Sequence, residues 1–152
     1  MSYAAPLGGT VNWVERPDGT RLRSVIVGDG ARDVVLAHGY GFSAESWNMV
    51  APALAAAGHR VVAFDQRGHG GSNVGTDGVG SAQMASDYAA ILEHPHVTEG
   101  VLFVHSRVGL VGINFLLNHP DVVTERLRGC MLMATFAGYL SRKNPRTASR
   151  SR

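Results

Sequence analysis

The chain has 152 residues, of which 45% are hydrophobic and 17% are charged, an ordinary balance for a single domain with its own core. No apolar run approaches the ~20 residues that a membrane span requires, and the N-terminus lacks the basic and apolar regions of a secretory signal. The formal net charge of +2 depends on five basic residues after position 140, and without them nine basic side chains face twelve acidic ones. We therefore expect a cytoplasmic protein with neither a membrane nor a nucleic acid as partner.

The N-terminal part of the chain predicts an antiparallel hairpin. Residues 10–16 and 21–27 have the composition and alternation of strands. The segment Pro17-Asp18-Gly19-Thr20 between them is a typical turn sequence, because proline presets φ and glycine tolerates a positive φ.

Beyond the hairpin, apolar strands alternate with helical segments. We expect strands at 33–37, 60–64, 101–104 and 129–136, with helices from Ser43 to Gly58, from Ser81 to about 94, and from the turn after 104 to before Pro120. Ser43 is expected to cap the first of these helices. The pattern predicts an α/β fold with a doubly wound, mostly parallel sheet. The expected organisation is a flexible N-terminus at 1–9, a core domain at 10–140 and a basic disordered tail at 141–152.

Residues 100–112, GVLFVHSRVGLVG, contain the main candidate for chemistry. An apolar strand runs into a turn at His105-Ser106-Arg107 and then into a helix, which is the geometry of a nucleophile elbow. The backbone N–H of Arg107 would lie at a helix N-terminus, where it could face a developing oxyanion. The simpler interpretation is that Ser106 is a helix N-cap.

The segment His38-Gly39-Tyr40-Gly41 follows the first buried strand, at the sheet edge where open α/β folds bind ligands. As an oxyanion loop, it would offer the backbone N–H of Tyr40 beside that of Arg107. A second interpretation is a dinucleotide-binding fingerprint, Gly39-x-Gly41-x-x-Ala44, with Asp65 as the ribose-binding acid. A third is a plain tight turn.

Three motifs, HGYG at 38–41, DQRGHGGS at 65–72 and VHS at 104–106, occur in an order and at a spacing that carry a family resemblance. Residues 10–136 resemble the first half of an α/β-hydrolase of the branch that contains epoxide hydrolases, haloperoxidases and esterases. The resemblance implies that Ser106 is the nucleophile, that Tyr40 and Arg107 supply the oxyanion hole through their N–H groups, and that no cofactor or metal is needed. Epoxide hydrolases have aspartate at the nucleophile position, so the serine indicates the esterase and haloperoxidase side of the family.

In that family the loop that contains Asp65, Arg67 and His69 is architectural, so none of the three is assigned to catalysis. The elbow itself departs from G-x-S-x-G, because Val104 and Val108 stand where small residues are expected. Two valines there predict crowding that costs ~1–3 kcal/mol.

The catalytic acid and histidine should follow the serine in chain order, yet only Asp121, Glu125 and His119 follow it, and none matches the family positions. We therefore expect an impaired serine hydrolase that acts on small esters or related carbonyl compounds. The resemblance ends after the sixth predicted strand, which predicts a truncated or frame-shifted relative.

Two alternatives remain at this stage. One is a non-catalytic fragment or partner-binding module, since an unpaired strand at 129–136 would favour self-association. The other is an NAD(P)-binding domain that uses Gly39, Gly41 and Asp65.

Overall fold

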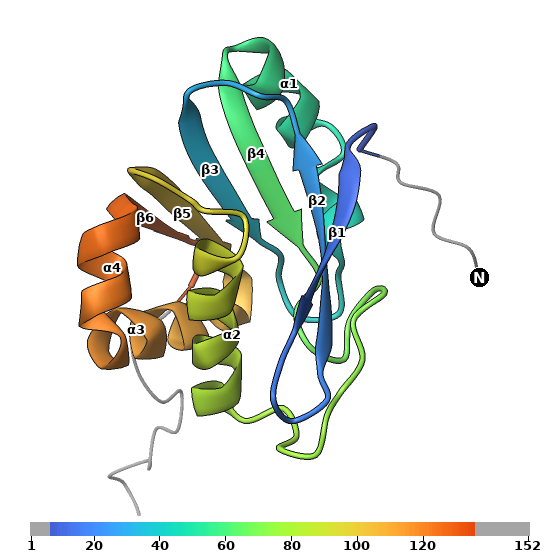
Figure 1. Ribbon diagram of the computed structural model, residues 1–152, viewed down its shortest axis with the longest axis vertical. Coiled ribbons are helices and arrows are strands. Elements are labelled where there is room, and N and C mark those ends of the chain that lie inside the picture. The colour runs from blue at the N-terminus through green and yellow to red at the C-terminus, as the bar shows by residue number, and fades with distance from the viewer. Residues whose placement is uncertain (1–6, 136–152) are drawn as a thin grey trace, which may run out of the picture.

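The structure is a computed structural model that describes residues 7–135. The predicted basic tail at 141–152 and most of the predicted N-terminal segment at 1–9 lie outside the described residues. Within the described part, one six-stranded sheet carries helices on both faces (Figure 1).

The sheet is mixed, with an antiparallel hairpin at one end and parallel strands at the other. Its strands lie in the order β1-β2-β4-β3-β5-β6. β1 pairs antiparallel with β2, and β2 with β4, whereas β4, β3, β5 and β6 pair in parallel. The bounds are β1 (Thr10–Glu15), β2 (Arg21–Val27), β3 (Arg32–Ala37), β4 (His59–Phe64), β5 (Gly100–His105) and β6 (Leu127–Met133). The predicted hairpin and the mostly parallel sheet are confirmed.

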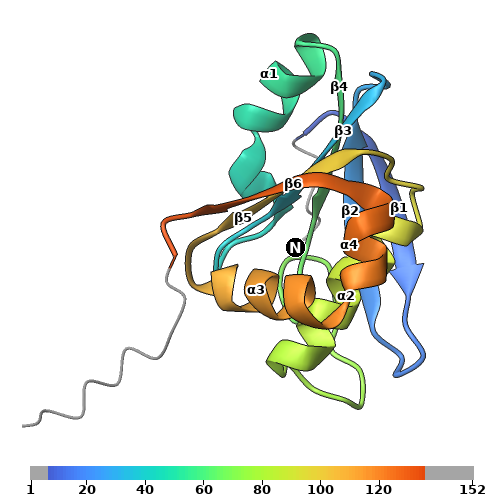
Figure 2. The same cartoon turned by 90° about the vertical axis from the view of Figure 1, so that its left-hand side faces the viewer.

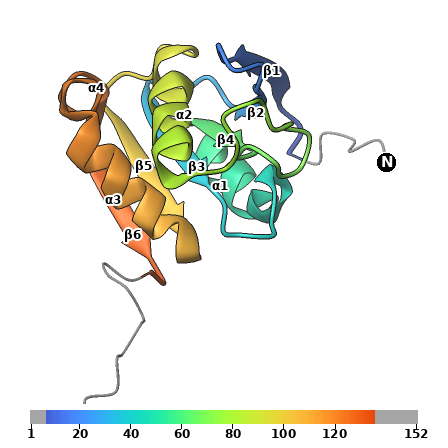
Figure 3. The ribbon, with the colours of Figure 1, turned by 90° about the horizontal axis from the view of Figure 1, so that it is seen from below.

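Helices cover the two faces of the sheet unequally (Figure 2). One face carries a short 3-10 helix, η1 (Ala44–Trp47), and α1 (Val50–Ala56). The opposite face carries α2 (Ser81–Glu93), α3 (Gly109–Asn118) and α4 (Pro120–Arg126). Seen from below, α2 and α3 lie side by side (Figure 3). In residues 7–135 every helix is too short or too polar to cross a membrane.

The central strands are buried on both faces, as their continuous apolar sequences predict. In β3, Val35 and Ala37 pack in the core beneath α2 and α3, whereas Leu36 packs in a second core beneath η1 and α1. All three side chains are at most 1% exposed. Because alternate residues of a strand point to opposite faces, the same strand anchors both layers and fixes where its carboxyl end lies.

The prediction for the first helix is wrong in two respects, because the segment is not one continuous helix and Ser43 does not cap it. Instead of one helix from Ser43 to Gly58, the chain forms η1 and then α1, which ends at Ala56. The Ser43 hydroxyl donates to the Glu45 carboxylate and makes no capping bond to the backbone. The buried carboxylate of Asp65 accepts the N–H of Ala44 instead, at 2.7 Å. An ionised acceptor forms a stronger bond to a backbone N–H than a hydroxyl does, so Asp65 takes the capping role predicted for Ser43.

Two boundaries near the C-terminal end also differ from prediction. The segment with Asp121 and Glu125 was expected to be a connection, but it forms α4, with Pro120 in its first turn. Proline favours that position because its missing N–H would be unpaired there in any case. β6 begins at Leu127 and ends at Met133, and Phe136, the predicted strand end, lies outside the described residues.

The part of the sheet formed by β5 and β6 is covered on one face only. α1 lies against β2 and β4, and on that same face Val101, Met131 and Met133 are 39%, 54% and 41% exposed. β6 is the last strand of the described sheet and pairs only with β5. An apolar, half-covered strand edge of this kind readily pairs with another chain.

Candidate active site

Ser106 lies at the corner between β5 and the helical turn that follows it. β5 ends at His105, η2 (Ser106–Val108) begins with the serine, and α3 follows. The φ angle of Ser106 is +68°, in the left-handed region that residues other than glycine seldom adopt. His105, and not Ser106, occupies the N-cap position, so the simple N-cap interpretation is wrong. The predicted sharp strand-to-helix turn is confirmed.

The loop after β3 lies directly beside this corner. β3 and β5 are parallel neighbours, so their carboxyl ends meet at the same edge of the sheet. A Cβ atom at Gly39 would lie 3.1 Å from the Cβ of Ser106 and 3.2 Å from Nδ1 of His105. A side chain at position 39 would be tight against both neighbours, so glycine eases the close approach of the two loops. The backbone segments of Tyr40 and Arg107 belong to these two adjoining loops.

His38, which begins the loop, is fully buried and has a defined tautomer. Nε2 accepts the backbone N–H of Gln66 at 3.1 Å, and Nδ1 lies 2.8 Å from the carbonyl oxygen of Gly39. A carbonyl only accepts, so Nδ1 carries the proton and the ring is neutral. Burial lowers the pKa of His38, and the nearby His69 ring lowers it further. His38 therefore joins the loop after β3 to Gln66, in the loop after β4, and is not available as a catalytic base.

Asp65 is the polar centre of the loop at 65–72. It is fully buried, and its carboxylate accepts the N–H groups of Ala44 and Gly71 and a guanidinium N–H of Arg23, at 2.7, 2.9 and 2.9 Å. A Cβ atom at Gly70 would lie 2.3 Å from the Asp65 carboxyl carbon, so only glycine fits there. A buried carboxylate needs this number of donors to offset its desolvation.

Arg67 ties the same loop to α2. Its guanidinium donates two bonds to the Asp87 carboxylate, at 2.6 and 2.8 Å, and reaches Asp18 in the hairpin turn at 3.0 Å. Arg67 and Asp87 are 3% and 2% exposed, and the H-bonds to Asp87 raise the pKa of Arg67. The architectural role expected for Asp65 and Arg67 is confirmed.

The described residues bring no catalytic acid or base to Ser106. Within 7–135, the hydrogen bonds of the structure bring neither a histidine nor a carboxylate to its hydroxyl. His105 packs against Trp47 on the η1 face, with ring centroids 6.2 Å apart. His119 stacks on Phe115 at the far end of α3. The remaining two candidates, Asp121 and Glu125, are exposed on α4.

Two glycines of α3 lie close to β5 and to the segment after β6. A Cβ atom at Gly112 would lie 3.2 Å from a methyl carbon of Val104, and one at Gly109 would overlap the side chain of Thr135. Val104 and Val108 are 0% and 5% exposed. Gly112 thus eases the close approach of α3 to Val104 in β5, and Gly109 leaves room for Thr135, which follows β6.

A hollow of about 540 Å³ opens beside the N-terminal end of α3. Its walls are mainly aliphatic, and the polar side chains among its lining include those of His69 and Ser81. The aliphatic side chains come from the loop after β4, from α2, from η2 and from α3: Val74, Val79, Met84, Val108, Leu110 and Val111. The hollow therefore lies at the sheet edge that bears Ser106 and offers apolar surface to a ligand.

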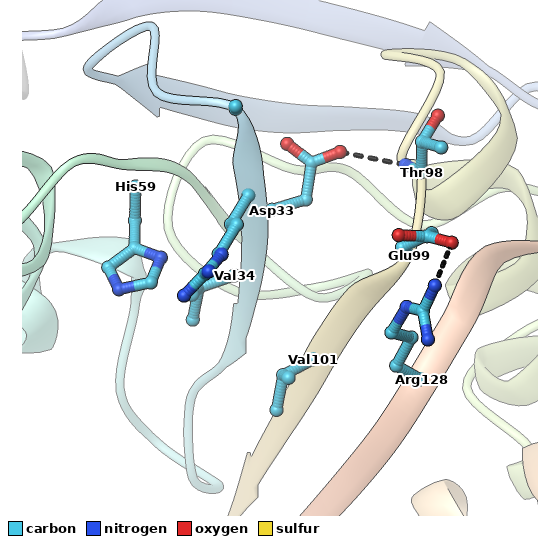
Figure 4. A pocket seen from close by; sticks show the side chains of 9 residues that line it. Asp33, Val34, His59, Thr98, Glu99, Val101 and Arg128 are labelled. Atoms are coloured by element: carbon cyan, nitrogen blue, oxygen red, sulfur yellow. Dashed lines mark hydrogen bonds and ion pairs between the residues drawn. The ribbon is translucent and has the colours of Figure 1, made fainter.

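A second hollow, of about 550 Å³, lies at the opposite ends of the strands (Figure 4). Its charged groups are largely paired: Asp33 accepts the N–H of Thr98 at 2.8 Å and two bonds from Arg60, and Glu99 pairs with Arg128. This hollow lies at the amino ends of β3 and β5, whereas Ser106 follows the carboxyl end of β5. This hollow is not part of the Ser106 site.

The NAD(P)-binding alternative does not fit the geometry. Both carboxylate oxygens of Asp65 are occupied within the fold, and the side chain is fully buried, so it cannot reach a ribose. The glycine motif is followed by the four-residue η1 and not by the long helix whose N-terminus would hold a pyrophosphate.

Comparison with known proteins agrees with the geometry. The family model for the α/β-hydrolase fold matches residues 34–148. The chain belongs to this family. It is 38% identical over 109 residues to epoxide hydrolase A of Mycobacterium tuberculosis, which covers 70% of the chain and 34% of the relative.

Solved structures show the same α/β-hydrolase architecture. A bromoperoxidase from Bacillus anthracis superposes with a TM-score of 0.77 at 26% identity, covering 86% of this chain and 46% of that one. An esterase from Exiguobacterium antarcticum gives 0.76 at 24% identity, over 83% and 46%, and supports the fold alone. The chain thus spans between a third and a half of the length of these relatives.

The partners that hold the loop at 65–72 were not predicted. Arg23 lies in β2 and Asp87 in α2, and both charged side chains are buried. A buried charge is rare unless it is paired. Charged residues inside a predicted core strand and helix were therefore the signal that partners exist. His69 was grouped with the architectural residues, yet its ring lines the apolar hollow.

Proposed function

We propose that this chain carries the nucleophile half of a serine hydrolase acting on esters or related carbonyl compounds. Ser106 is the proposed nucleophile, and the backbone N–H groups of Tyr40 and Arg107 are the proposed oxyanion donors. The observation that carries the proposal is the left-handed backbone of Ser106 at the end of β5, beside Gly39. Strained backbone of this kind costs about 1–3 kcal/mol and is concentrated at functional sites.

In the proposed reaction, Oγ of Ser106 adds to the carbonyl carbon and its proton passes to a base. The carbonyl π electrons move to oxygen, where two backbone N–H groups stabilise the charge. Collapse of this intermediate expels the alcohol and leaves an acyl-enzyme, which water then hydrolyses. Because no base contacts Ser106 within residues 7–135, we expect the isolated chain to acylate slowly, with the residual acceleration of about 10³–10⁴-fold over water that binding and an oxyanion hole alone provide.

The serine itself favours carbonyl substrates over epoxides. The family resemblance places aspartate at this position in epoxide hydrolases, and this chain has Ser106 there. The hollow beside α3 supports a small substrate with an apolar part, since six aliphatic side chains line it.

A fluorophosphonate probe tests the nucleophile without requiring turnover. We expect covalent labelling of the full chain that maps to Ser106 by mass spectrometry and is lost in Ser106→Ala. Ser46→Ala is a matched control, because Ser46 is an exposed serine on the neighbouring η1, and it should label like the parent. Labelling that persists in Ser106→Ala, or none in a folded parent, would contradict the proposal.

A second proposed function, self-association through residues 129–136, rests on the edge strand. Met131, Leu132 and Met133 are 54%, 36% and 41% exposed, and within the described sheet β6 pairs on one side only. Sedimentation velocity over a hundredfold concentration range should show dimers or larger species in the parent and fewer in Met131→Lys, because a charge opposes edge pairing. A monomer at every concentration would rule this function out.

A further inference from the structure

His69 lines the hollow at the N-terminal end of α3, at the sheet edge that bears Ser106, but has no part in the acyl chemistry proposed above. Its side chain is partly exposed. On one side it borders the apolar hollow, and on the other it borders a shallower hollow formed with residues of the loop after β3. The ring therefore stands where a ligand at the sheet edge would meet it.

The hydrogen bond of Nδ1 fixes which ring nitrogen His69 presents. Nδ1 lies 3.1 Å from the backbone carbonyl oxygen of Arg67. Since a carbonyl can only accept, Nδ1 carries the proton and Nε2 keeps its lone pair in the neutral ring. Among residues 7–135 no hydrogen bond of the structure reaches Nε2. His69 thus offers a hydrogen-bond acceptor.

Main-chain hydrogen bonds fix the backbone of His69, from which the ring projects. The N–H of His69 donates to the carbonyl of Gln66, and the His69 carbonyl accepts the N–H of Ser72, both at 2.9 Å. The flanking residues Gly68 and Gly70 have φ angles of +73° and +53°, which glycine adopts without strain. The rings of Tyr40 and His38 lie 5.5 and 5.3 Å away between centroids. A side chain so constrained loses little conformational entropy when it binds a ligand.

The surroundings of His69 define what a ligand should contain. The aliphatic walls of the hollow favour an apolar chain, and the acceptor at Nε2 favours an N–H or O–H group. An acceptor that binds a donor in a partly enclosed apolar site discriminates against a ligand that lacks the donor, because the acceptor is then left unsatisfied.

We propose that His69 contacts the substrate and selects carbonyl compounds that carry a hydrogen-bond donor next to an apolar chain, such as secondary amides, over analogues without the donor. The proposal deepens the proposed function and depends on it only for the position of the reacting carbonyl. It requires no proton transfer by His69.

Two amides that differ by one methyl group test this selection. N-methylhexanamide carries one N–H, and N,N-dimethylhexanamide carries none. Binding is measured by NMR titration in Ser106→Ala, so that no covalent step intervenes. We expect N-methylhexanamide to bind about three- to tenfold more tightly, the range of one neutral hydrogen bond, and to shift the ¹⁵N resonance of His69 Nε2.

His69→Phe and His69→Gln, each in the Ser106→Ala chain, separate the acceptor from the ring. His69→Phe keeps a ring beside Tyr40 but removes the acceptor, so this variant should bind both amides equally. Glutamine keeps an acceptor and should retain part of the preference. The ¹⁵N shift in the chain that retains His69 decides the question even where a variant fails to fold.

Equal binding of the two amides in the chain that retains His69, or an unmoved Nε2 resonance, would overturn the selection while leaving fluorophosphonate labelling of Ser106 unaffected. Conversely, a preference that is present without any labelling in the otherwise unaltered chain would refute the nucleophile and leave the role of His69 standing.

Discussion

Two loops at the carboxyl edge of the sheet differ in how their polar groups are satisfied. In the loop at 65–72, Asp65 receives three N–H donors from separate segments, and Arg67 binds Asp87 through two bonds. At the elbow, the hydroxyl of Ser106 has no hydrogen-bond partner among residues 7–135, and its backbone is left-handed. The carboxylate and guanidinium of one loop are paired inside the fold, and the other loop holds a serine hydroxyl on a left-handed backbone.

The two loops differ in whether the partners they need lie within the described residues. The buried ion pairs link the hairpin, the loop and α2 within the described residues. Within residues 7–135 no acid or histidine reaches the serine hydroxyl, which its proposed chemistry would need. The stability of the buried pairs and the proposed reactivity of Ser106 can therefore be tested separately.

Removing the charge of Arg67 should have the largest effect. In Arg67→Met, Asp87 stays buried and retains only Arg16, whose Nε lies 3.3 Å away. Breaking a buried pair by deleting one partner typically costs about 3–5 kcal/mol. We expect a loss of this size in the free energy of unfolding, measured by urea denaturation and far-UV circular dichroism.

Two further variants show whether the loss comes from the uncompensated charge. Arg67→Met combined with Asp87→Leu should recover a large part of the stability, since the Asp87 carboxylate is removed together with its partner and Asp18 keeps its two bonds from Thr20. Glu15→Gln disrupts the exposed pair with Arg21 and should change the free energy by less than about 1 kcal/mol. If all three variants lost the same amount, the buried network would have no special role.

Most of the fold could be predicted from the sequence, because continuous apolar strands and turn residues are local signals. The strands at 33–37 and 60–64 are buried on both faces as expected, and the break at Gly58 is present. The first helix was predicted wrongly because Asp65, 21 residues further along the chain, takes the N–H of Ala44. Such a contact is set by tertiary structure and leaves no local pattern.

The candidate site was predictable in position but not in detail. The order of the motifs placed Ser106 beside the loop of Gly39, and the structure brings these two residues together. The tautomers of His38 and His69 depend on carbonyl groups that face the rings only after folding. The contacts of Gly112 with Val104 and of Gly109 with Thr135 likewise depend on how α3 packs against β5 and β6.

Replacing Ser106 with glycine should have a smaller effect of the opposite sign. Glycine adopts the left-handed φ of +68° without the Cβ clash, so Ser106→Gly should stabilise the fold by about 1 kcal/mol, the lower end of the cost of such strain. Ser106→Ala keeps the Cβ atom and loses only the hydroxyl, so its urea midpoint should stay close to that of the parent. A midpoint in Ser106→Gly no higher than in Ser106→Ala would mean that the turn stores no strain.

The smallest expected effect concerns pH and arises at His38, which bonds to Gln66 in the loop at 65–72 and to Gly39 in the loop after β3. Burial lowers the pKa of His38 in the folded protein below its ordinary 6.5. Between these two values the unfolded chain binds more protons, so the free energy of unfolding rises with pH. The contribution is complete above about pH 6.5 and is lost as the pH falls through the folded-state value.

Urea denaturation at pH 5, 6, 7 and 8 measures this slope, with His38→Asn as the reference that removes the titrating ring. The other histidines titrate in both proteins, so only the difference between the two slopes reports on His38. We expect the parent to lose more stability than His38→Asn between pH 7 and 5. Parallel curves would mean that Gln66 and Gly39 do not hold the ring neutral. The hydrogen bonds of the loop at 65–72 would then not help to order the loop of Gly39 beside Ser106.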